Sequence, residues 1–191
     1  MKPLVLIGGG GHCRSVIEAA ESCGRMIYGI IDTPDKIGDN VLGYKIIDSD
    51  DNLSRYIPDY EFIITIGQIS NTDIRRRISD KIATLGGVMG IVTASTANIS
   101  RFASIGAGTV ILHGAMINAG AGTGVNCIVN TLANIDHDTL VGDFCHISTG
   151  VMVNGGCVIG NDVFIGSGSV IAHGISVAGG SIVAAGTVLK N

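Results

Sequence analysis

Branched aliphatic residues recur every six positions through the second half of the chain. Only Thr123 departs from Ile, Val or Leu in this series, and no insertion shifts its phase. A period of six fits neither the roughly 3.6-residue repeat of a helix nor the two-residue alternation of a strand. It predicts a parallel β-helix in which three short rungs complete one triangular coil. The series is Ile99, Ile105, Ile111, Ile117, Thr123, Val129, Ile135, Val141, Ile147, Val153, Ile159, Ile165, Ile171, Val177, Val183 and Leu189.

Uncharged and mostly small residues follow four positions after each aliphatic residue. They include Cys127, Cys145 and Cys157, which we therefore interpret as structural thiols. Small residues allow tight corners, while each inward Ile or Val contributes roughly 1.5–3 kcal/mol when fully buried. One coil cannot bury its own core, so stability is expected to come from stacking along the helix.

The first part of the chain has a different pattern. Short apolar runs alternate with stretches of helical character, which predicts a small parallel α/β domain of Rossmann-like type. We place this domain at residues 1–94 and the β-helix domain at residues 95–191, with the boundary near 92–96. The expected strands are 3–7, 26–31 and 61–66, and the expected helices are 12–22 and 71–85; residues 43–47 are expected to be either a further strand or one arm of a hairpin.

A glycine run after the first expected strand is typical of a phosphate site. In open parallel sheets ligands bind beyond the carboxyl ends of the strands, and glycines let a phosphate approach a helix N-terminus. Gly10, Gly11 and His12 supply such a turn. Because Cys13 interrupts the dinucleotide fingerprint, a mononucleotide or a nucleotide sugar is favoured over NAD.

Three further residues are candidates for the same site. Asp32 ends the second strand, where its carboxylate either accepts a hydrogen bond from a base or ribose or serves the turn. Gly67 follows a later strand and allows a second close approach of the backbone to a ligand. Arg75 lies in the middle of the second helix, where it either neutralises phosphate or faces solvent.

Charge and cysteine content exclude some classes of protein. The net charge of −4 leaves no basic stripe for nucleic acid. Five cysteines without metal-type spacing indicate reduced thiols and a cytoplasmic protein. The N-terminal apolar run is too short for a signal peptide, and no stretch is long enough for membrane insertion.

Polar residues gather in one coil of the expected β-helix. His137 lies two positions past the inward Ile135, so its ring is expected on the outer surface. Asp138 can orient that ring, and an ordinary histidine pKa of about 6.5 suits a general base. Gly155 follows one coil later, so its N–H can face the same reacting carbonyl. His146 lies half a coil away, so we expect it to meet His137 only across a cleft between neighbouring helices.

At these residues the chain resembles a known family. The matching segments are Asn130-Thr131, Asp136-His137-Asp138, residues 141–148 and Gly155, together with the glycine turn and residues 66–67. They resemble the NeuD/PglD-like branch of hexapeptide acyltransferases over essentially the whole chain. The resemblance implies a left-handed parallel β-helix, a homotrimer, and acetyl-CoA bound between adjacent helices. It also implies that the N-terminal domain holds a nucleotide-linked 4-amino-4,6-dideoxy sugar as the acetyl acceptor.

The resemblance also assigns roles in the acetyl-transfer step. It implies that His137 removes a proton from the sugar C4 amine, that Asn130 places this amine, and that the Gly155 N–H holds the acetyl carbonyl. It implies that His146 contacts substrate or thioester across the interface. Ala184 and Ala185 are likewise expected at the acetyl-CoA site.

In the N-terminal domain, the resemblance implies that Gly10, Gly11 and His12 hold the diphosphate while Asp32 faces the nucleobase or ribose. Two departures from the family pattern stand out. Asp138 is shorter than the glutamate that often follows the histidine, which affects its reach. The chain also ends at residues 190–191, where many relatives continue with a short tail, so any adenine contact from such a tail is expected to be missing.

The expected chemistry is direct transfer in a ternary complex, because no cysteine adjoins His137 in the rung pattern. O-acetylation of a sialic-acid-type sugar on the same scaffold is the nearest alternative. A hexapeptide carbonic anhydrase needs three zinc-binding histidines, and no third histidine follows His173, so we expect no metal. We interpret His113 and His173 as solvated corner residues. A non-enzymatic β-helix scaffold leaves the glycine-turn domain unexplained.

Overall fold

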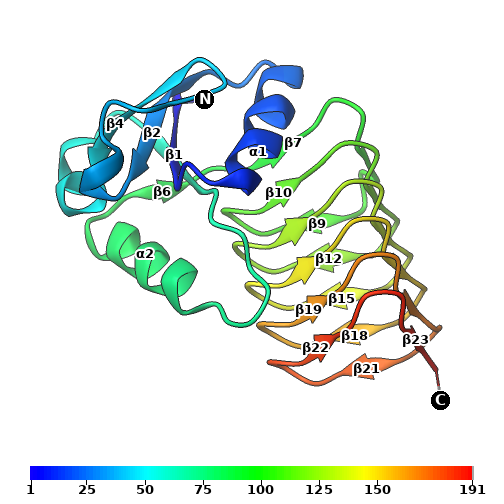
Figure 1. Cartoon of the computed structure of the whole chain (residues 1–191). Helices are drawn as coiled ribbons and strands as arrows, with labels where there is room; N and C mark the ends of the chain where they lie inside the picture. Colours follow the sequence, from blue (N-terminus) through cyan, green and yellow to red (C-terminus); the bar gives the residue numbers. More distant parts are fainter. Residues whose placement is uncertain (191) are drawn as a thin grey trace.

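The computed structural model describes residues 1–190 and shows an α/β domain that lies against one side of a parallel β-helix. In Figure 1 the two helices and the mixed sheet occupy the N-terminal part, and the stacked coils extend away from them toward the C-terminus. The expected combination of an N-terminal α/β domain and a C-terminal β-helix is therefore confirmed. None of the helices in the described residues is long and apolar enough to cross a membrane.

The N-terminal sheet has the strand order β3-β4-β2-β1-β5-β6, in which only the β3–β4 hairpin is antiparallel. Alternation along β1 (Leu4–Ile7) divides the core, since Leu4 and Leu6 pack with α1 (Gly11–Ser22) on one face while Val5 and Ile7 pack beside α2 (Asp73–Thr84) on the other. The other strands are β2 (Ile27–Asp32), β3 (Asn40–Val41), β4 (Tyr44–Ser49), β5 (Glu61–Ile64) and β6 (Val88–Met89). Two short 3-10 turns are η1 (Pro34–Lys36) and η2 (Asp50–Arg55).

The expected elements all exist with small shifts of their ends. The second helix begins after Thr72 and ends at Thr84, so it is shorter than residues 71–85. Thr72 does not cap it through its side chain, because the Thr72 hydroxyl donates a hydrogen bond to Asp162 of the β-helix instead. Residues 88–89, which were not among the expected strands, form β6 at the edge of the N-terminal sheet.

The β-helix has three faces, each a sheet in which every strand pairs in parallel with the strand three places later. The face beside the N-terminal domain, here called the domain face, contains β7 (Val92–Thr93), β10 (Val110–Ile111), β13 (Ile128–Val129), β16 (His146–Ile147), β19 (Phe164–Ile165) and β22 (Ile182–Val183). The second face contains β8 (Asn98–Ile99), β11 (Met116–Ile117), β14 (Asn134–Ile135), β17 (Met152–Val153), β20 (Val170–Ile171) and β23 (Val188–Leu189). The third face contains β9 (Ser104–Ile105), β12 (Gly122–Thr123), β15 (Leu140–Val141), β18 (Val158–Ile159) and β21 (Ser176–Val177).

The residues of the six-residue series point inward and form one continuous core. Ile117, Ile135 and Val153 stack in register on successive coils and are fully buried. The small companion residues close the corners inside the same core, including Cys127, Cys145 and Cys157, all of which are buried free thiols. The six-residue period therefore predicted the inward positions correctly. Its one polar member, Thr123, is also buried, and its hydroxyl has no hydrogen-bond partner among the described residues.

From Gly108 to Gly186, every sixth residue lies at a corner of the β-helix and adopts the left-handed backbone region. Glycine fills most of these positions, for example Gly120 with φ +75° and Gly156 with φ +68°. Larger residues fill the others at a steric cost of about 1–2 kcal/mol each. Those residues, all with positive φ, are Asn126, Leu132, Asp138, Phe144 and Asp162.

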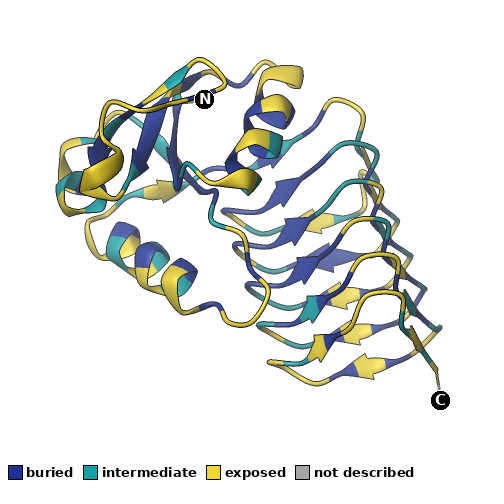
Figure 2. Ribbon diagram, viewed as in Figure 1, coloured by how far each residue is buried: buried dark blue, intermediate teal, exposed yellow. Residues whose placement is uncertain are grey.

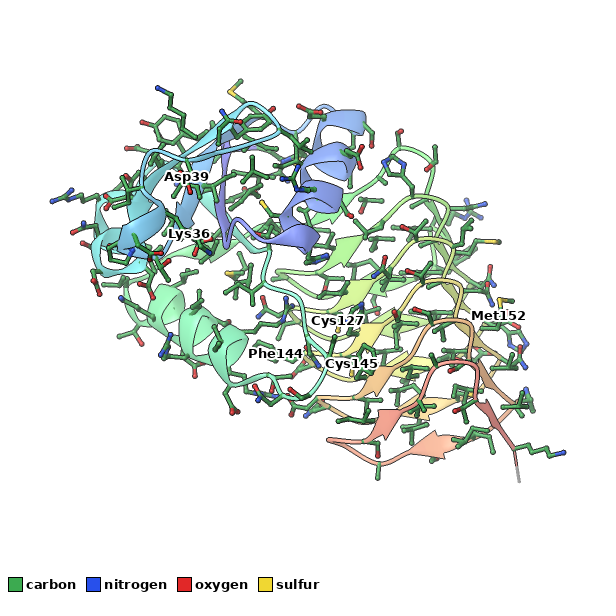
Figure 3. The ribbon with its side chains drawn as sticks, viewed as in Figure 1. Lys36, Asp39, Cys127, Phe144, Cys145 and Met152 are labelled. Atoms are coloured by element: carbon green, nitrogen blue, oxygen red, sulfur yellow. The ribbon has the colours of Figure 1, made fainter. Side chains whose placement is uncertain are left out.

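Three of these larger residues share one corner, which we call the docking corner, between the third face and the domain face. Asp162 accepts two hydrogen bonds from Arg76, at 2.9 and 2.7 Å, and one from Thr72. The Phe144 ring lies 4.2 Å below the Arg76 guanidinium, and Asn126 donates to Ser79. Figure 3 shows Phe144 on the side of the β-helix that faces α2. The side chains that occupy strained corner positions thus hold the two domains together.

This docking buries the upper part of the domain face. Val110, Ile128 and His146 point outward from the β-helix yet are buried, whereas Ile182, near the far end, is exposed. Figure 2 shows the same gradient along the coils. Because β7 already pairs with β10, the β-helix sheet begins at Val92–Thr93.

Candidate active site

A pocket of about 380 Å³ lies at the carboxyl ends of β1, β2 and β5, where α1 begins. It brings together Gly10, Gly11, His12, Asp32 and Gly67, five of the six residues expected to bind substrate in this domain. Within the described part of the chain no side chain caps α1, and the first turn of this helix carries no acidic residue. Free N–H groups at a helix N-terminus attract a negatively charged group. The pocket therefore has the features of a phosphate site.

Lys36 and Thr65 also line this pocket, although the sequence analysis did not select them. The Lys36 ammonium lies 3.2 Å from both carboxylate oxygens of Asp32, four residues earlier. Asp32 also accepts hydrogen bonds from the Gly9 and Thr33 N–H groups. Partial burial raises the pKa of Asp32, but these donors and Lys36 outweigh it and lower the pKa overall. Asp32 thus orders the turn after β2. The i,i+4 spacing between Asp32 and Lys36 was the sequence signal from which Lys36 could have been selected.

His12 is neutral in this pocket. Burial lowers the pKa of its imidazole to about 3, with smaller effects from Arg75 and His146, and its Nε2 has no hydrogen-bond partner within the described residues. A neutral ring gives a phosphate no charge. The positive groups at this pocket are the N-terminus of α1 and the Lys36 ammonium.

Arg75 is outside the pocket. Its side chain is 2% exposed, and its guanidinium donates to the carbonyls of Ile66 and Asn126. Burial lowers its pKa to about 10, so it remains charged at neutral pH. Arg75 therefore neither meets a phosphate nor faces solvent, the two roles that its position in the sequence suggested. It joins the loop after β5 to the docking corner.

His137 and Gly155 lie on the corner between the second and third faces, which we call the histidine corner. His137 is exposed, as expected, and its Nδ1 lies 2.9 Å from Asp138 Oδ2. The positive φ of Asp138, +58°, turns this shorter carboxylate back toward the ring. The hydrogen bond that His137 donates to Asp138 raises the pKa of His137, and the charge of Asp136 adds to that effect. Asp138 therefore reaches His137.

Since Asp138 can only accept, Nδ1 of His137 carries the proton and Nε2 is the free base nitrogen. A Cβ on Gly155 would lie 2.5 Å from this Nε2, so the ring covers the Gly155 backbone. The N–H of Gly155 donates no hydrogen bond within residues 1–190. A base nitrogen thus lies beside the backbone of a residue whose N–H has no acceptor within residues 1–190, an arrangement that suits proton removal beside a developing oxyanion.

The structure places Asn130 and His146 away from the histidine corner, on the side next to the N-terminal domain. His146 is 8% exposed, and its Nδ1 donates to the Gln68 carbonyl at 2.7 Å. Its Nε2 therefore accepts from the Asn130 amide at 3.1 Å. Burial lowers the pKa of His146, which keeps it neutral. These side chains join the domains of one chain, and Asn130 does not lie next to His137 in that chain.

Ala184 and Ala185 lie near the far end of the β-helix, on the corner between the domain face and the second face. Ala184 lines a hollow of about 360 Å³ together with Val177, Val183 and Leu189. Ala185 stacks against the previous coil, where a Cβ on Gly166 would lie 2.5 Å from its nitrogen. The structure does not bring either residue to His137 of the same chain.

The described residues contain no cluster of three or more His, Cys, Asp or Glu that could hold a metal ion. The His137 and His173 rings do approach each other, with centroids 6.4 Å apart. His173 is therefore part of the histidine corner. From the sequence, His173 was weighed beside His137 as a zinc ligand and interpreted as a solvated corner residue.

Comparisons with known proteins agree with this arrangement. Residues 3–82 match the family model for the PglD N-terminal domain, and residues 156–191 match that for the bacterial transferase hexapeptide (six repeats). A search of curated proteins found no match.

Three solved structures are similar over nearly the whole chain. The acetyltransferase domain of PglB from Neisseria gonorrhoeae, in complex with acetyl coenzyme A, is 31% identical, with 99% of this chain and 91% of that chain covered and a TM-score of 0.89. A histidine-to-asparagine mutant of perosamine N-acetyltransferase from Caulobacter crescentus, with CoA and GDP-perosamine, is 26% identical, covers 92% of this chain and 91% of that one, and has a TM-score of 0.77. WeeI from Acinetobacter baumannii, at 16% identity, 100% and 97% coverage and a TM-score of 0.55, shares the fold.

Proposed function

This chain belongs to the NeuD/PglD-like family of hexapeptide acyltransferases, and we propose that it moves an acetyl group from acetyl-CoA to the C4 amine of a nucleotide-linked 4-amino-4,6-dideoxy sugar. The similar structures carry acetyl-CoA in one case and CoA with GDP-perosamine in another. The observation that supports this chemistry most directly is the His137 ring, oriented by Asp138 over the open N–H of Gly155.

The reaction needs a base, an oxyanion donor and close placement of two substrates. A neutral amine attacks a thioester readily, so the chain needs no covalent intermediate. His137 Nε2 accepts the proton that the amine loses as the C–N bond forms, and the resulting imidazolium is stabilised by Asp138. The Gly155 N–H donates to the carbonyl oxygen as it gains charge. All five cysteines are free, four of them are buried, and none is placed in this step.

The nucleotide fits the pocket of the N-terminal domain. The uncapped α1 N-terminus and Lys36 supply donors and charge for a diphosphate. Gly67, which also lines the pocket, lets the protein backbone approach the ligand closely. A nucleoside diphosphate sugar extends beyond this pocket, so the sugar attached to the diphosphate projects from the domain. That sugar must reach a His137, and the His137 of the same chain lies on the opposite side of the β-helix.

We infer that a second copy supplies the histidine corner, as in a homotrimer with sites between subunits. Within one chain, the pocket adjoins the domain face through Gln68 and His146, whereas the histidine corner is the one opposite that face. Exposed apolar side chains flank the histidine corner on both of its faces, as a contact between copies requires. They are Met116, Leu140, Met152 and Val158. Figure 3 shows Met152 on the side away from α2.

The direct test is acetyl transfer to a panel of nucleotide 4-amino sugars that differ in base, followed by mass spectrometry. The expected result is the gain of one acetyl group on one acceptor. His137→Ala should remove this activity, and His113→Ala, at another corner, should keep it. Acetylation of a sialic-acid-type sugar hydroxyl, with none of the amines modified, would replace the proposal by O-acetyl transfer.

A second experiment tests the shared site. Gly11→Asp places a carboxylate at the α1 N-terminus, where open space surrounds Gly11, and so should repel a diphosphate. Co-expression of Gly11→Asp with His137→Ala should restore activity that neither variant has alone, because mixed assemblies contain one intact pocket beside one intact histidine. Inactive mixed assemblies would place both parts of the site in one chain.

A further inference from the structure

His173 occupies the same corner position as His137, two coils later. Val153 pairs with both Ile135 and Ile171, so the residues that follow these strands stack in one column. The column runs from His137 through Gly155 to His173. The two imidazole rings are tilted by 42° with their centroids 6.4 Å apart, and both are exposed.

Glycine at the middle coil is what allows this approach. Gly155 has no side chain to separate the rings, and a Cβ on the adjacent Gly156 would lie 3.6 Å from His173 Cε1. The Nε2 of His137 faces Gly155 because its Nδ1 is held by Asp138. A carbonyl bound to the Gly155 N–H therefore has one imidazole on the preceding coil and another on the following coil.

During attack, the carbonyl carbon of the thioester holds both the incoming amine and the departing sulfur. The preceding and following coils offer one imidazole to each of these two groups. The incoming amine must lie at His137, since that ring accepts its proton. The sulfur leaves from another position on the same tetrahedral carbon, and the following coil places His173 there. An imidazolium near the departing thiolate can donate a proton to it.

We propose that His173 is the acid that protonates the sulfur of departing coenzyme A, an inference that rests on the proposed function. The amine N–H bond breaks as its proton passes to His137 Nε2, and the C–N bond forms while the carbonyl electron pair moves to oxygen. The pair then returns, the C–S bond breaks, and the sulfur takes the proton of the His173 imidazolium. His137 has gained one proton and His173 has lost one, so exchange with water restores both rings.

The charges around the corner differ for the two rings. Asp138 accepts from His137 and Asp136 lies beside it, while no carboxylate bonds to His173 within residues 1–190. The remaining charged side chains of the corner are Arg101, two coils before His137, and Lys190, one coil after Ala172. His137 is thus held as an oriented base, whereas His173 is free to turn toward a leaving group.

The test compares His173→Gln and His173→Arg with the unsubstituted protein and with His113→Gln, a corner histidine on another column. Steady-state kinetics are measured with acetyl-CoA and the identified amino sugar across pH. The proposal expects kcat of His173→Gln to fall about 10–100-fold, with the KM for acetyl-CoA changed less than about twofold. The unsubstituted enzyme should lose kcat/KM at alkaline pH, as a step that needs a proton donor does, and His173→Gln should lack that limb. His113→Gln should match the unsubstituted enzyme.

Three results would overturn the proposal. They are an unchanged kcat and alkaline limb in His173→Gln, a loss confined to the KM for acetyl-CoA, and full activity in His173→Arg, which retains charge but gives no proton. Because the side chain is exposed, each variant is expected to unfold at the same temperature as the unsubstituted protein. Failure of the unsubstituted protein to acetylate any amino sugar would refute the proposed function itself, a result distinct from unchanged transfer by His173→Gln.

Discussion

The Nε2 atom of His137 lies 2.5 Å from the point that a Cβ atom would occupy on Gly155. The backbone of Gly155 does not have a positive φ, so glycine is not needed there for the chain to turn. It is needed because the imidazole of the preceding coil rests on it. A side chain at residue 155 should therefore disturb the position of the His137 ring and leave the fold intact.

Gly155→Ala should reduce acetyl transfer about 100-fold with little change in stability, since the new methyl group displaces the His137 ring from the reacting atoms. Activity and urea unfolding measured on the same preparation check both parts. The matched control is Gly155→Ala in a His137→Ala background. There the ring is absent, so the second substitution should cost almost nothing further. Additive losses in the double variant would show that Gly155 acts independently of the ring.

Asp138→Asn should lower the pKa of His137, because the charged hydrogen-bond acceptor that raises it is lost. Asparagine tolerates the positive φ of this corner, so the backbone should be retained. Since the reaction needs neutral His137, the acid limb of kcat/KM should move to lower pH, with kcat down about 10-fold. Titration of the His137 ring by NMR gives an independent value. A limb that stays in place would remove Asp138 from the control of this base.

Asp162→Ala should destabilise the protein by about 2 kcal/mol, as it removes the partners of Arg76 and Thr72 and leaves a non-glycine residue at φ +62°. Asp162→Gly removes the same contacts but relieves the backbone. It should therefore be about 1 kcal/mol more stable than the alanine variant in urea unfolding. Equal stability of the two variants would mean that the corner carries no strain.

Thr123→Val should stabilise the protein by about 1 kcal/mol, because a methyl group of similar shape replaces a buried hydroxyl that has no hydrogen-bond partner within residues 1–190. Thr109→Val is the matched control. The Thr109 hydroxyl donates to the Gly124 carbonyl and accepts from the Cys127 N–H, so its loss should cost about 1–2 kcal/mol. Thermal unfolding of both variants tests the contrast. Destabilisation by Thr123→Val would indicate that its hydroxyl finds a partner in solution.

The periodic part of the structure was predictable because each inward residue meets only its copies on neighbouring coils. Ile135 pairs with Ile117 and Val153 whatever else the chain does, so a local count was enough to assign it. The column of His137 and Gly155 followed from the same count. The proximity of His173 followed from it as well, but an exposed histidine with no polar neighbour in sequence gave no reason to select it.

Arg75, Asn130 and His146 were harder to place for one physical reason. Their environments depend on which corner and face of the β-helix the N-terminal domain covers, and that depends on contacts between residues far apart in the chain. Arg75 meets the Asn126 carbonyl, and His146 meets the Gln68 carbonyl. No period in either domain encodes these pairs.

The sequence by itself determined the β-helix, the glycine turn and the exposed imidazole of His137, because these depend on spacing within one repeat or one strand–helix unit. Only the tertiary structure decided which polar side chains became buried links between the domains. It also showed that Asp138 reaches its histidine through a left-handed corner. The reason is that burial and backbone handedness follow from packing between distant segments, which a residue's immediate neighbours in the chain do not specify.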